Sequence, residues 1–515
     1  MRLTAAILWL SFAAVLEERL ACDSKSKSKG NGTNAAGDDT KMIQRDQISL
    51  RLKIFHGLGA IAYGVKDNGF SVFLLTFYNQ VLGLDAAMVG GVIMVALFAD
   101  AFVDLIIGEL GDRTQTRWGR RLPWLYTAAL PLGLAWLALW NPPQVSDTLL
   151  LTWLFVFAII VRALVSACEV PSFALVPELT GDYHERTQLV RFRFLFAWAG
   201  GLVIAVIAYG LIFSGEGAVT KPGGYPAYAL LCAILITGSV LISALGQHKY
   251  IAHPSPPRSA DTGTPTDIFR EMRHSLSNRA FLILLTAAVF VFISQAITFS
   301  MINYVMVFIW RLDQAGLTLY GLSLFVSLIV AFTLVTPMSK YFGKKGAAIV
   351  ACAISAGLFA ALYSAWLWQI FPGAPAAPHI WSLFAIMIFI SGFAIIPMML
   401  NGSMMADVVE ASQAETGRRS EGLFFAGYFF MQKFALGIGI FISGNILSII
   451  GFPAQAKAGE VALPILQNLA IALALINIFL AVSYMILVRR FPITKQDHDE
   501  RRARLAGIGG NSIVD

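Results

Sequence analysis

Two carboxylates stand in a stretch that otherwise carries apolar residues. In ADAFVDLIIGELGDR (99–113), Asp100 and Asp104 are four residues apart, so they share one face of a helix. An ionised side chain at the centre of a lipid-embedded helix costs about 2.5–3.5 kcal/mol on insertion scales. Two carboxylates held close together suit a proton or a small hard cation, which prefers oxygen ligands. Because no basic residue of the same run could neutralise them locally, we expect Asp100 and Asp104 to form a cation-binding site.

Six further ionisable residues interrupt apolar runs of the same kind. They are Lys66, Asp67, Arg162, Glu169, Arg193 and Lys433. Together with Asp100 and Asp104 they are four acidic and four basic residues. This balance favours one interior network of ion pairs over eight unrelated buried charges. The alternative is that they are structural ion pairs that hold helices together. The sequence leaves this alternative open for Lys433, and above all for Arg162.

Three charges follow the carboxylate pair at the end of its run. Glu109 and Asp112 lie where a side chain can reach water, and Arg113 comes directly after them. We expect these three residues to form a latch between two halves of the molecule. Their predicted role is therefore gating, not ligand binding.

The elements that must position these residues are membrane helices. Of the 515 residues, 57% are hydrophobic and 13% are charged, with a mean hydropathy of +0.68, whereas soluble domains carry about 25% charged residues. Twelve apolar runs are long enough to span a bilayer, which takes about 20 residues. They lie near 54–81, 87–110, 122–141, 149–176, 191–214, 226–247, 279–309, 316–340, 346–369, 379–404, 421–450 and 464–490. Backbone polar groups must be satisfied internally in lipid, so the sequence predicts an all-α membrane protein with twelve transmembrane helices.

Charge in the loops predicts the orientation. The basic loop residues are Arg113, Arg117, Arg120, Arg121, Arg186, Arg191, Lys340, Lys344, Lys345, Arg418 and Arg419, followed by the tail RRFPITKQDHDERRARL. The opposite loops carry Lys221, Arg311 and Lys457. Cytoplasmic loops are enriched in Lys and Arg, so we expect both termini in the cytoplasm. The net charge of +7 thus reflects the orientation of the chain in the membrane, and no nucleic-acid partner is expected.

The polar segments divide the chain into five parts. We expect a disordered N-terminal extension (1–49), a six-helix half (50–247), a cytoplasmic linker (248–278), a second six-helix half (279–490) and a cytoplasmic tail (491–515). The linker is rich in Pro, Ser and Thr and includes a short amphipathic helix near 266–276. Two six-helix halves around a midplane site are the architecture of major facilitator transporters.

The sequence contains no motif that is typical of an enzyme active site. It has no nucleotide-binding loop, no HExxH and no GxSxG motif, so we expect neither an enzyme nor a cofactor. The four cysteines are Cys22, Cys168, Cys232 and Cys352, and their spacing fits no metal site. No metal is expected beyond a Na⁺ ion at Asp100 and Asp104.

Five stretches together resemble the glycoside–pentoside–hexuronide:cation symporter family of the major facilitator superfamily. They are YGVKDNGF (63–70), FADAFVDLIIGELGDRTQTRWGRRLPW (98–124), EVPSFALVPELTGDYHERTQLVRFR (169–193), ADVVEASQAETGRRSEG (406–422) and Lys433. The resemblance implies that Asp100 and Asp104 bind the coupling cation and that Ser166 supplies a neutral oxygen. Val103 stands where the family has an asparagine. Because Na⁺ needs several oxygen ligands and a proton needs one base, we favour H⁺ over Na⁺.

The same resemblance implies a substrate site. Lys66, Asp67, Glu169, Arg193 and Lys433 match positions that contact sugar hydroxyls or link the two sites. Phe173 and Met398 stand where the best-known member has tryptophans, and Tyr428 stands where it has a glutamine. This predicts a less polar pocket, and it leaves open a sugar, a glycoside with an apolar aglycone, or a uronide.

We therefore expect a cation-coupled symporter that works by alternating access. It would be a monomer in the lipid of a bacterial inner (plasma) membrane. The alternative is a lysolipid or amphiphile translocator of the same superfamily.

Overall fold

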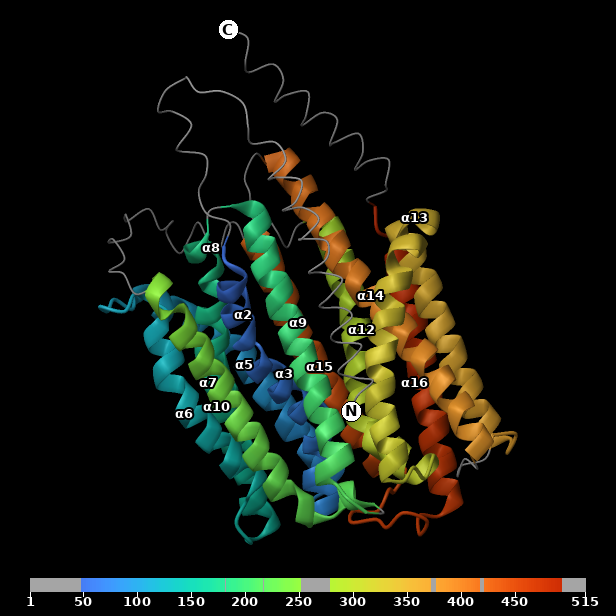
Figure 1. The fold of residues 1–515 in the computed structure, drawn as a ribbon. Helices are drawn as coiled ribbons and strands as arrows, with labels where there is room; N and C mark the ends of the chain where they lie inside the picture. Colours follow the sequence, from blue (N-terminus) through green and yellow to red (C-terminus); the bar gives the residue numbers. More distant parts are fainter. Residues whose placement is uncertain are drawn as a thin grey trace, which may run out of the picture. The chain divides into compact units, whose positions relative to one another are not determined.

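The computed structural model describes residues 48–180, 182–215, 217–251, 278–371, 377–416 and 421–492. Most of the predicted extension, the helix at 266–276, Cys22 and most of the tail lie outside these residues. Every regular element among the described residues is helical, which confirms the predicted all-α class (Figure 1). The described residues from Ser49 onward belong to one compact unit.

The first part of the unit, up to residue 251, is built from long helices and a few short ones. Its elements are α2 (Leu50–Leu58), α3 (Ile61–Asn68), the π-helical turns η2 (Gly69–Phe73) and η3 (Phe77–Val81) with α4 (Leu74–Thr76) between them, α5 (Ala86–Arg113), α6 (Leu122–Trp140), α7 (Asp147–Ala174), α8 (Val176–Leu179), α9 (Tyr183–Ile207), η4 (Ala208–Ile212), η5 (Ala218–Thr220), η6 (Pro222–Gly224) and α10 (Tyr225–Ile251). The bounds of α5 and α6 lie within three residues of the apolar runs that predicted them.

The second part contains fewer but longer helices. They are α12 (Arg279–Tyr304), η7 (Val305–Ile309), α13 (Gln314–Leu367), α14 (Ala377–Thr416), α15 (Glu421–Ile449) and α16 (Leu463–Arg489). Within α13, Gly343 has φ 70° and ψ 166°, a left-handed backbone that interrupts the helix and that glycine adopts most readily.

Ten helices among the described residues are long and apolar enough to cross a membrane. The sequence predicts twelve runs, and two local features account for the difference. The first run is divided between α2, α3 and the short elements that end at Val81, none of which is long enough alone. The runs 316–340 and 346–369 both fall within α13, on either side of Gly343.

Helices α5 and α15 approach each other closely at one end. A Cβ atom on Gly444 of α15 would lie 2.2 Å from the carbonyl oxygen of Ala86, and one on Gly90 of α5 would lie 3.0 Å from the carbonyl oxygen of Ile440. The Ser448 hydroxyl donates a 2.7 Å hydrogen bond to Asp85, whose other oxygen caps the start of α5. These contacts join the first part of the unit to the second.

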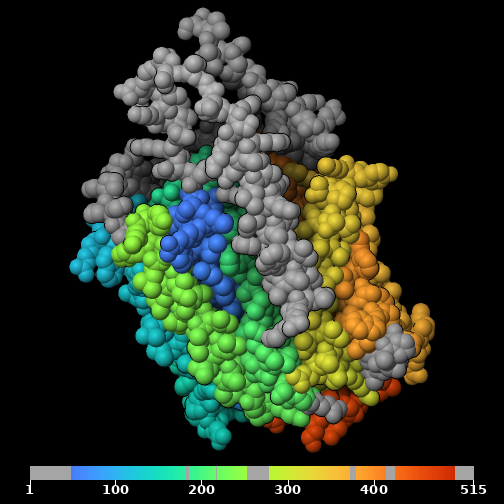
Figure 2. Space-filling model, in the orientation of Figure 1, coloured from blue at the N-terminus to red at the C-terminus, as the bar shows by residue number. Residues whose placement is uncertain are grey.

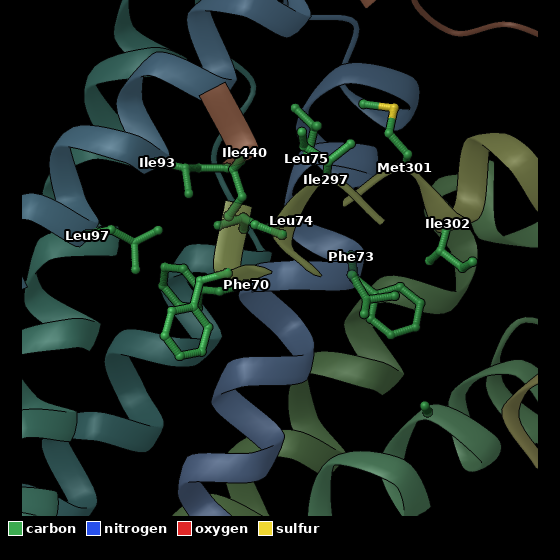
Figure 3. Close-up of a cluster of buried hydrophobic side chains, with 14 of the residues drawn as sticks. Phe70, Phe73, Leu74, Leu75, Ile93, Leu97, Ile297, Met301, Ile302 and Ile440 are labelled. Atoms are coloured by element: carbon green, nitrogen blue, oxygen red, sulfur yellow. The ribbon is translucent and has the colours of Figure 1, made fainter. Parts of the chain in front are cut away.

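Buried apolar side chains join the two parts at the same helices. Figure 3 shows a cluster formed by Phe70, Phe73, Leu74, Leu75, Ile93, Leu97, Ile297, Met301, Ile302 and Ile440. Its members come from the first helical run, α5, α12 and α15. In Figure 2 the green surface that includes α9 borders the yellow surface that includes α13. Beyond the end of α9, the Gln314 amide of α13 donates to the carbonyl oxygen of Gly210 in η4 at 2.9 Å.

Buried amides add polar contacts across this boundary. Asn303 of α12 donates from Nδ2 to the carbonyl oxygen of Val72 (2.8 Å) and to Thr76 (3.2 Å), and its Oδ1 accepts from Tyr209 (2.7 Å). Gln80 donates to the carbonyl oxygen of Pro453 (3.1 Å). Since buried amides are costly when unpaired, these bonds define a specific closed arrangement of this end.

Candidate functional site: a charge cluster between three helices

Helix α5 places Asp100 and Asp104 one turn apart, as the spacing predicts. Their surroundings differ. The Asp100 side chain is 3% exposed, and the Asp104 side chain is 31% exposed. One carboxylate is therefore enclosed by protein, while the other remains open to small ligands.

Asp100 is held by two side chains of α7. Arg162 donates to Asp100 Oδ2 from Nε (2.9 Å) and from Nη2 (2.6 Å), and Ser166 donates to Oδ1 (2.8 Å). Arg162 and Ser166 are four residues apart, so one face of α7 presents both donors. The Arg162 guanidinium also lies 5.2 Å from the ring centre of Phe70. These contacts identify Asp100 as the partner of Arg162, which the sequence alone did not determine.

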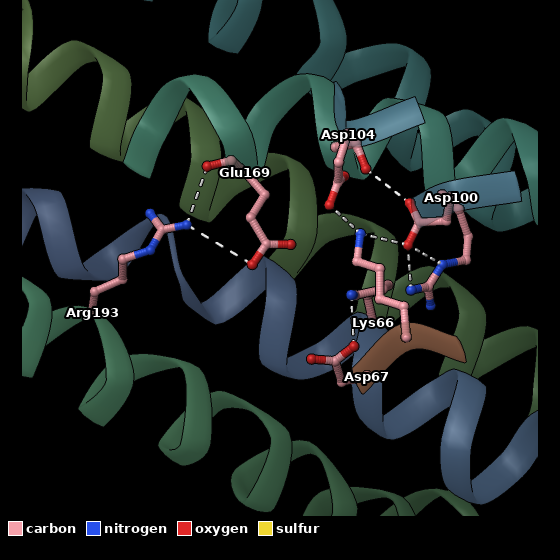
Figure 4. A network of polar contacts seen from close by, with 9 residues as sticks. Lys66, Asp67, Asp100, Asp104, Glu169 and Arg193 are labelled. Atoms are coloured by element: carbon pink, nitrogen blue, oxygen red, sulfur yellow. Dashed lines mark hydrogen bonds and ion pairs between the residues drawn. The ribbon is translucent and has the colours of Figure 1, made fainter. Parts of the chain in front are cut away.

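Lys433 of α15 lies between the two carboxylates. Its Nζ is 2.8 Å from Asp100 Oδ2 and 2.5 Å from Asp104 Oδ2. Figure 4 labels these two carboxylates. Two acids and two bases thus form a neutral cluster, hereafter the carboxylate cluster: Asp100, Asp104, Arg162 and Lys433. The position between the carboxylates is occupied by an ammonium of the protein itself.

A second group of charges lies near the carboxylate cluster, in the same view (Figure 4). On α3, Lys66 Nζ is 2.6 Å from Asp67 Oδ1; Lys66 is buried, whereas the Asp67 side chain is 63% exposed. This exposed carboxylate is available to a ligand.

Arg193 of α9 reaches the end of α7. It donates to the Ser172 hydroxyl (2.7 Å) and to the backbone carbonyl of Glu169 (3.3 Å), and it lies 3.9 Å from the Glu169 carboxylate. The rings of Tyr63 and Phe173 lie 4.8 and 5.3 Å from its guanidinium carbon. Phe173, an expected pocket residue, therefore belongs to this group, and both Phe173 and Glu169 are partly exposed.

The other two expected pocket residues have different surroundings. Met398 of α14 lines a cavity formed mainly by α12, α13, α14 and α16. Tyr428 of α15 is buried, and its ring centre lies 5.5 Å from that of Phe292 on α12.

The three expected gating residues have partners within the first part of the unit. Arg113 pairs with Glu109 at 2.7 Å, both exposed, and Asp112 pairs with Arg121. Arg121 also contacts Glu178 at 3.4 Å. The latch between halves stays a prediction.

Two buried polar groups were not predicted from the sequence. Lys53 of α2 pairs with Glu185 (2.6 Å) and donates to Gln188 (2.6 Å) on α9, and His56 hydrogen-bonds Gln247 of α10 at 2.9 Å. Their position could have indicated burial, because Lys53 and His56 lie at or beside an apolar run that must bury one face.

The described residues hold no group of three or more His, Cys, Asp or Glu side chains that could bind a metal. A monovalent cation between Asp100 and Asp104 would have to displace the Lys433 ammonium. The described cysteines Cys168 and Cys232 are buried, and Cys352 is partly buried.

The fold and the buried charges define a class of protein. The structure resembles the nucleoside transporter NupG (TM-score 0.60, 14% identity, 85% of this chain and 99% of that chain). It also resembles a D-xylose–proton symporter (TM-score 0.59, 16% identity, 86% and 98%). With ten long apolar helices among its described residues, the chain is an integral membrane protein with the fold of major facilitator transporters.

The family follows from the sequence comparison. Residues 55–495 match the family described as MFS/sugar transport protein, and the chain belongs to it. It is 26% identical to uncharacterized symporter sll1374 of Synechocystis sp., over 92% of this chain and all of that protein. It is 26% identical to the putative glycoside/cation symporter YagG of Escherichia coli (87% and 93%) and 24% identical to the isoprimeverose transporter of Lactiplantibacillus pentosus (83% and 86%). These relatives are transporters, not enzymes, which confirms the predicted class and the family resemblance.

Proposed function

We propose that this protein imports a sugar, glycoside or uronide together with a proton. The observation that carries the proposal is the placement of Lys433 between Asp100 and Asp104, because it couples a helix of the second part to the carboxylates of the first. The printed names of the relatives, which include a glycoside/cation symporter and an isoprimeverose transporter, support a sugar as the transported compound.

The proton is favoured over Na⁺ by the partners of Asp100. Both of its oxygens accept hydrogen bonds from Arg162 and Ser166, and Lys433 adds a further contact. A Na⁺ ion needs several oxygen ligands, whereas a proton needs one base. Asp104 is that base. When it takes a proton, it releases Lys433, which stays paired with Asp100.

The exposed charges around Arg193 suit hydroxyl recognition. Glu169 and Asp67, whose side chains are partly exposed, can accept hydrogen bonds from sugar hydroxyls, and the partly exposed ring of Phe173 can cover an apolar sugar face. The buried Arg193 and Lys66 position these two carboxylates. Charge-assisted hydrogen bonds in an enclosed site are strongly discriminating. By linkage, a proton at Asp104 that tightens substrate binding must itself be bound more tightly when substrate is present.

Alternating access requires two halves that move against each other, and we propose that residues 50–247 and 279–490 are these halves. The interruption at Gly343 and the divided first run support twelve crossings. The basic loops support a bacterial inner-membrane protein with both termini, the linker 248–278 and the tail 491–515 in the cytoplasm. The same orientation makes the end where Gly444 meets Ala86 the outer, closed end. Glu109, Asp112 and Arg113 then lie at the inner end, where a latch would act.

Purified protein in liposomes tests the proposal. Methyl glycosides of xylose, glucose, galactose and glucuronic acid would be offered under an imposed pH gradient or an imposed Na⁺ gradient. We expect uphill uptake of at least one of them, driven by the pH gradient. Lysophosphatidylcholine movement without uptake of any glycoside would contradict the proposal and support the amphiphile translocator.

A further inference from the structure

Two glutamine side chains cross the boundary between the two parts of the unit in opposite directions. Gln80, in η3 of the first part, donates from Nε2 to the carbonyl oxygen of Pro453 (3.1 Å), and its Oε1 accepts from the backbone N–H of Ala456 (3.0 Å). Pro453 and Ala456 lie in the loop after α15. Gln80 thus holds that loop by both ends of one amide group.

Gln314 makes the same pair of contacts from the second part. As the first residue of α13, it donates from Nε2 to the carbonyl oxygen of Gly210 (2.9 Å), and its Oε1 accepts from the backbone N–H of Gly215 (3.3 Å). Gly210 and Gly215 lie in and just beyond η4, which continues α9. Each part therefore supplies one glutamine that binds the backbone after a long helix of the other part. These two glutamines, Gln80 and Gln314, are hereafter the clasps.

The clasps lie beside two matching turns. In each part a π-helical turn, η3 or η7, is followed two residues later by a left-handed residue, Gly83 (φ 89°) or Arg311 (φ 49°). A Leu and then an Asp that caps the next helix follow in both cases. Gln80 precedes the first left-handed residue by three positions, and Gln314 follows the second by three. Since π-helical turns are frequent at functional sites, the repeated turn marks this end of both parts.

The loop after α15 rests on both turns. The buried ring of Phe452 has its centre 5.5 Å from that of Tyr304 and 5.1 Å from that of Phe308, which lies in η7. The Gln455 amide donates to the carbonyl oxygen of Val81, the last residue of η3, at 3.2 Å. This loop therefore covers the ends of the first helical runs of the two parts.

The contacts of the clasps suit an interface that opens and closes. Gln80 is 1% exposed, and a buried amide without partners is costly, so its bonds favour the closed arrangement. The backbone at Pro453 and Gly215 is on exposed residues, where water can replace the glutamine once the parts separate. Neither glutamine carries a charge, so opening separates no ion pair at the clasps.

We propose that Gln80 and Gln314 are positioning residues of the outer gate, which lose their contacts together when the site opens to the outside. The two clasps join the same two parts in opposite directions, so the parts cannot separate at this end while either contact is kept. That this end is the outer one rests on the proposed function.

Hydrogen–deuterium exchange of the full-length protein in lipid nanodiscs, with no substrate present, tests the proposal. Gln80→Met keeps the length of the side chain and removes its hydrogen bonds. We expect backbone amides to exchange at least five-fold faster in the loop 450–461 and also in 208–215, around the other clasp. Gln314→Met should have the same effect on both segments, and it provides a second variant if the first does not fold.

Asn141→Leu is the matched control. Asn141 lies at the end of α6 and donates only to the carbonyl oxygen of Leu137, four residues earlier (2.8 Å), so both segments should exchange as in the unmodified protein. Faster exchange that is confined to the loop held by the substituted clasp would overturn the proposal, because the two contacts would then be independent. An equal increase in α8, near the opposite end, would also overturn it, since it would indicate a general loss of stability. Failure of glycoside import would contradict the proposed function and leave the exchange result standing.

Discussion

The ammonium of Lys433 lies 2.5 Å from the carboxylate of Asp104, and the two residues are 329 positions apart in the chain. This contact joins α15 to α5 at the depth where Arg162 neutralises Asp100. A proton on Asp104 removes one half of the ion pair, so protonation and the contact between the two helices are coupled.

Loss of the ammonium should abolish coupling. In Lys433→Met, Asp104 loses its partner on α15, so a proton on Asp104 no longer changes the contact between α5 and α15. The pH gradient then no longer drives accumulation. We expect the ratio of internal to external glycoside to fall to about one in liposomes. Lys457→Met, in an exposed loop pair with Glu460, should retain accumulation.

Removal of Arg162 should destabilise the protein and create a Na⁺ site. Breaking a buried ion pair costs about 3–5 kcal/mol when one charge remains, and Lys433 offsets part of that cost here. Arg162→Met should therefore lower the melting temperature in detergent, and Asp100→Asn in the same chain should restore part of it. Because Asp100 Oδ2 loses both hydrogen bonds from Arg162, it can accept a cation, and NaCl should stabilise Arg162→Met relative to KCl. Stabilisation of the unmodified protein by NaCl relative to KCl would contradict the choice of the proton as the coupling ion.

The contact between Gly444 and Ala86 should not tolerate a methyl group. A Cβ at Gly444 would lie 2.2 Å from a backbone oxygen, so α5 and α15 must separate in Gly444→Ala. We expect a lower melting temperature and at least a ten-fold loss of uptake. Gly238→Ala is the matched control, since no atom lies within 4 Å of its added Cβ and alanine favours a helix by about 1 kcal/mol. An unchanged Gly444→Ala would contradict the closed arrangement of this end.

The Asn303 amide should be needed for the same closed end. Asn303→Ala leaves the Val72 carbonyl and the Tyr209 hydroxyl without this partner, at about 1–3 kcal/mol for each buried group left unpaired. We expect a lower melting temperature for this variant. Asn445→Ala removes an amide that donates only locally, to the Phe441 carbonyl of its own helix, and should change the melting temperature little.

The sequence predicted the helices and the depth of the charges better than their partners. Apolar runs fixed the bounds of α5 and α6 closely, and the four-residue spacing put Asp100 and Asp104 on one face. A run reports which residues lie in lipid or core, but it does not report which helix packs beside it. For that reason the pairing of Asp100 with Arg162, and of Asp104 with Lys433, emerged only from the packing of α5 against α7 and α15.

The number of long helices shows a similar limit. Hydropathy separated the runs 316–340 and 346–369 on either side of Gly343, where the backbone of α13 is interrupted. It does not reveal that the first run is divided by Gly59 and Ala60, because neither residue reduces the apolar character of the segment. Backbone conformation at a single glycine is set by the space around it as well as by its type.

The most direct measurement of the central claim is proton entry itself, recorded with a pH-sensitive dye inside liposomes when an imported methyl glycoside is added outside. The account predicts acidification with the unmodified protein, independent of Na⁺. Asp104→Asn should give no acidification while it still exchanges labelled for unlabelled glycoside, whereas Asp147→Asn, at the exposed start of α7, should acidify. Glycoside-dependent acidification by Asp104→Asn would contradict the assignment of Asp104 as the coupling residue.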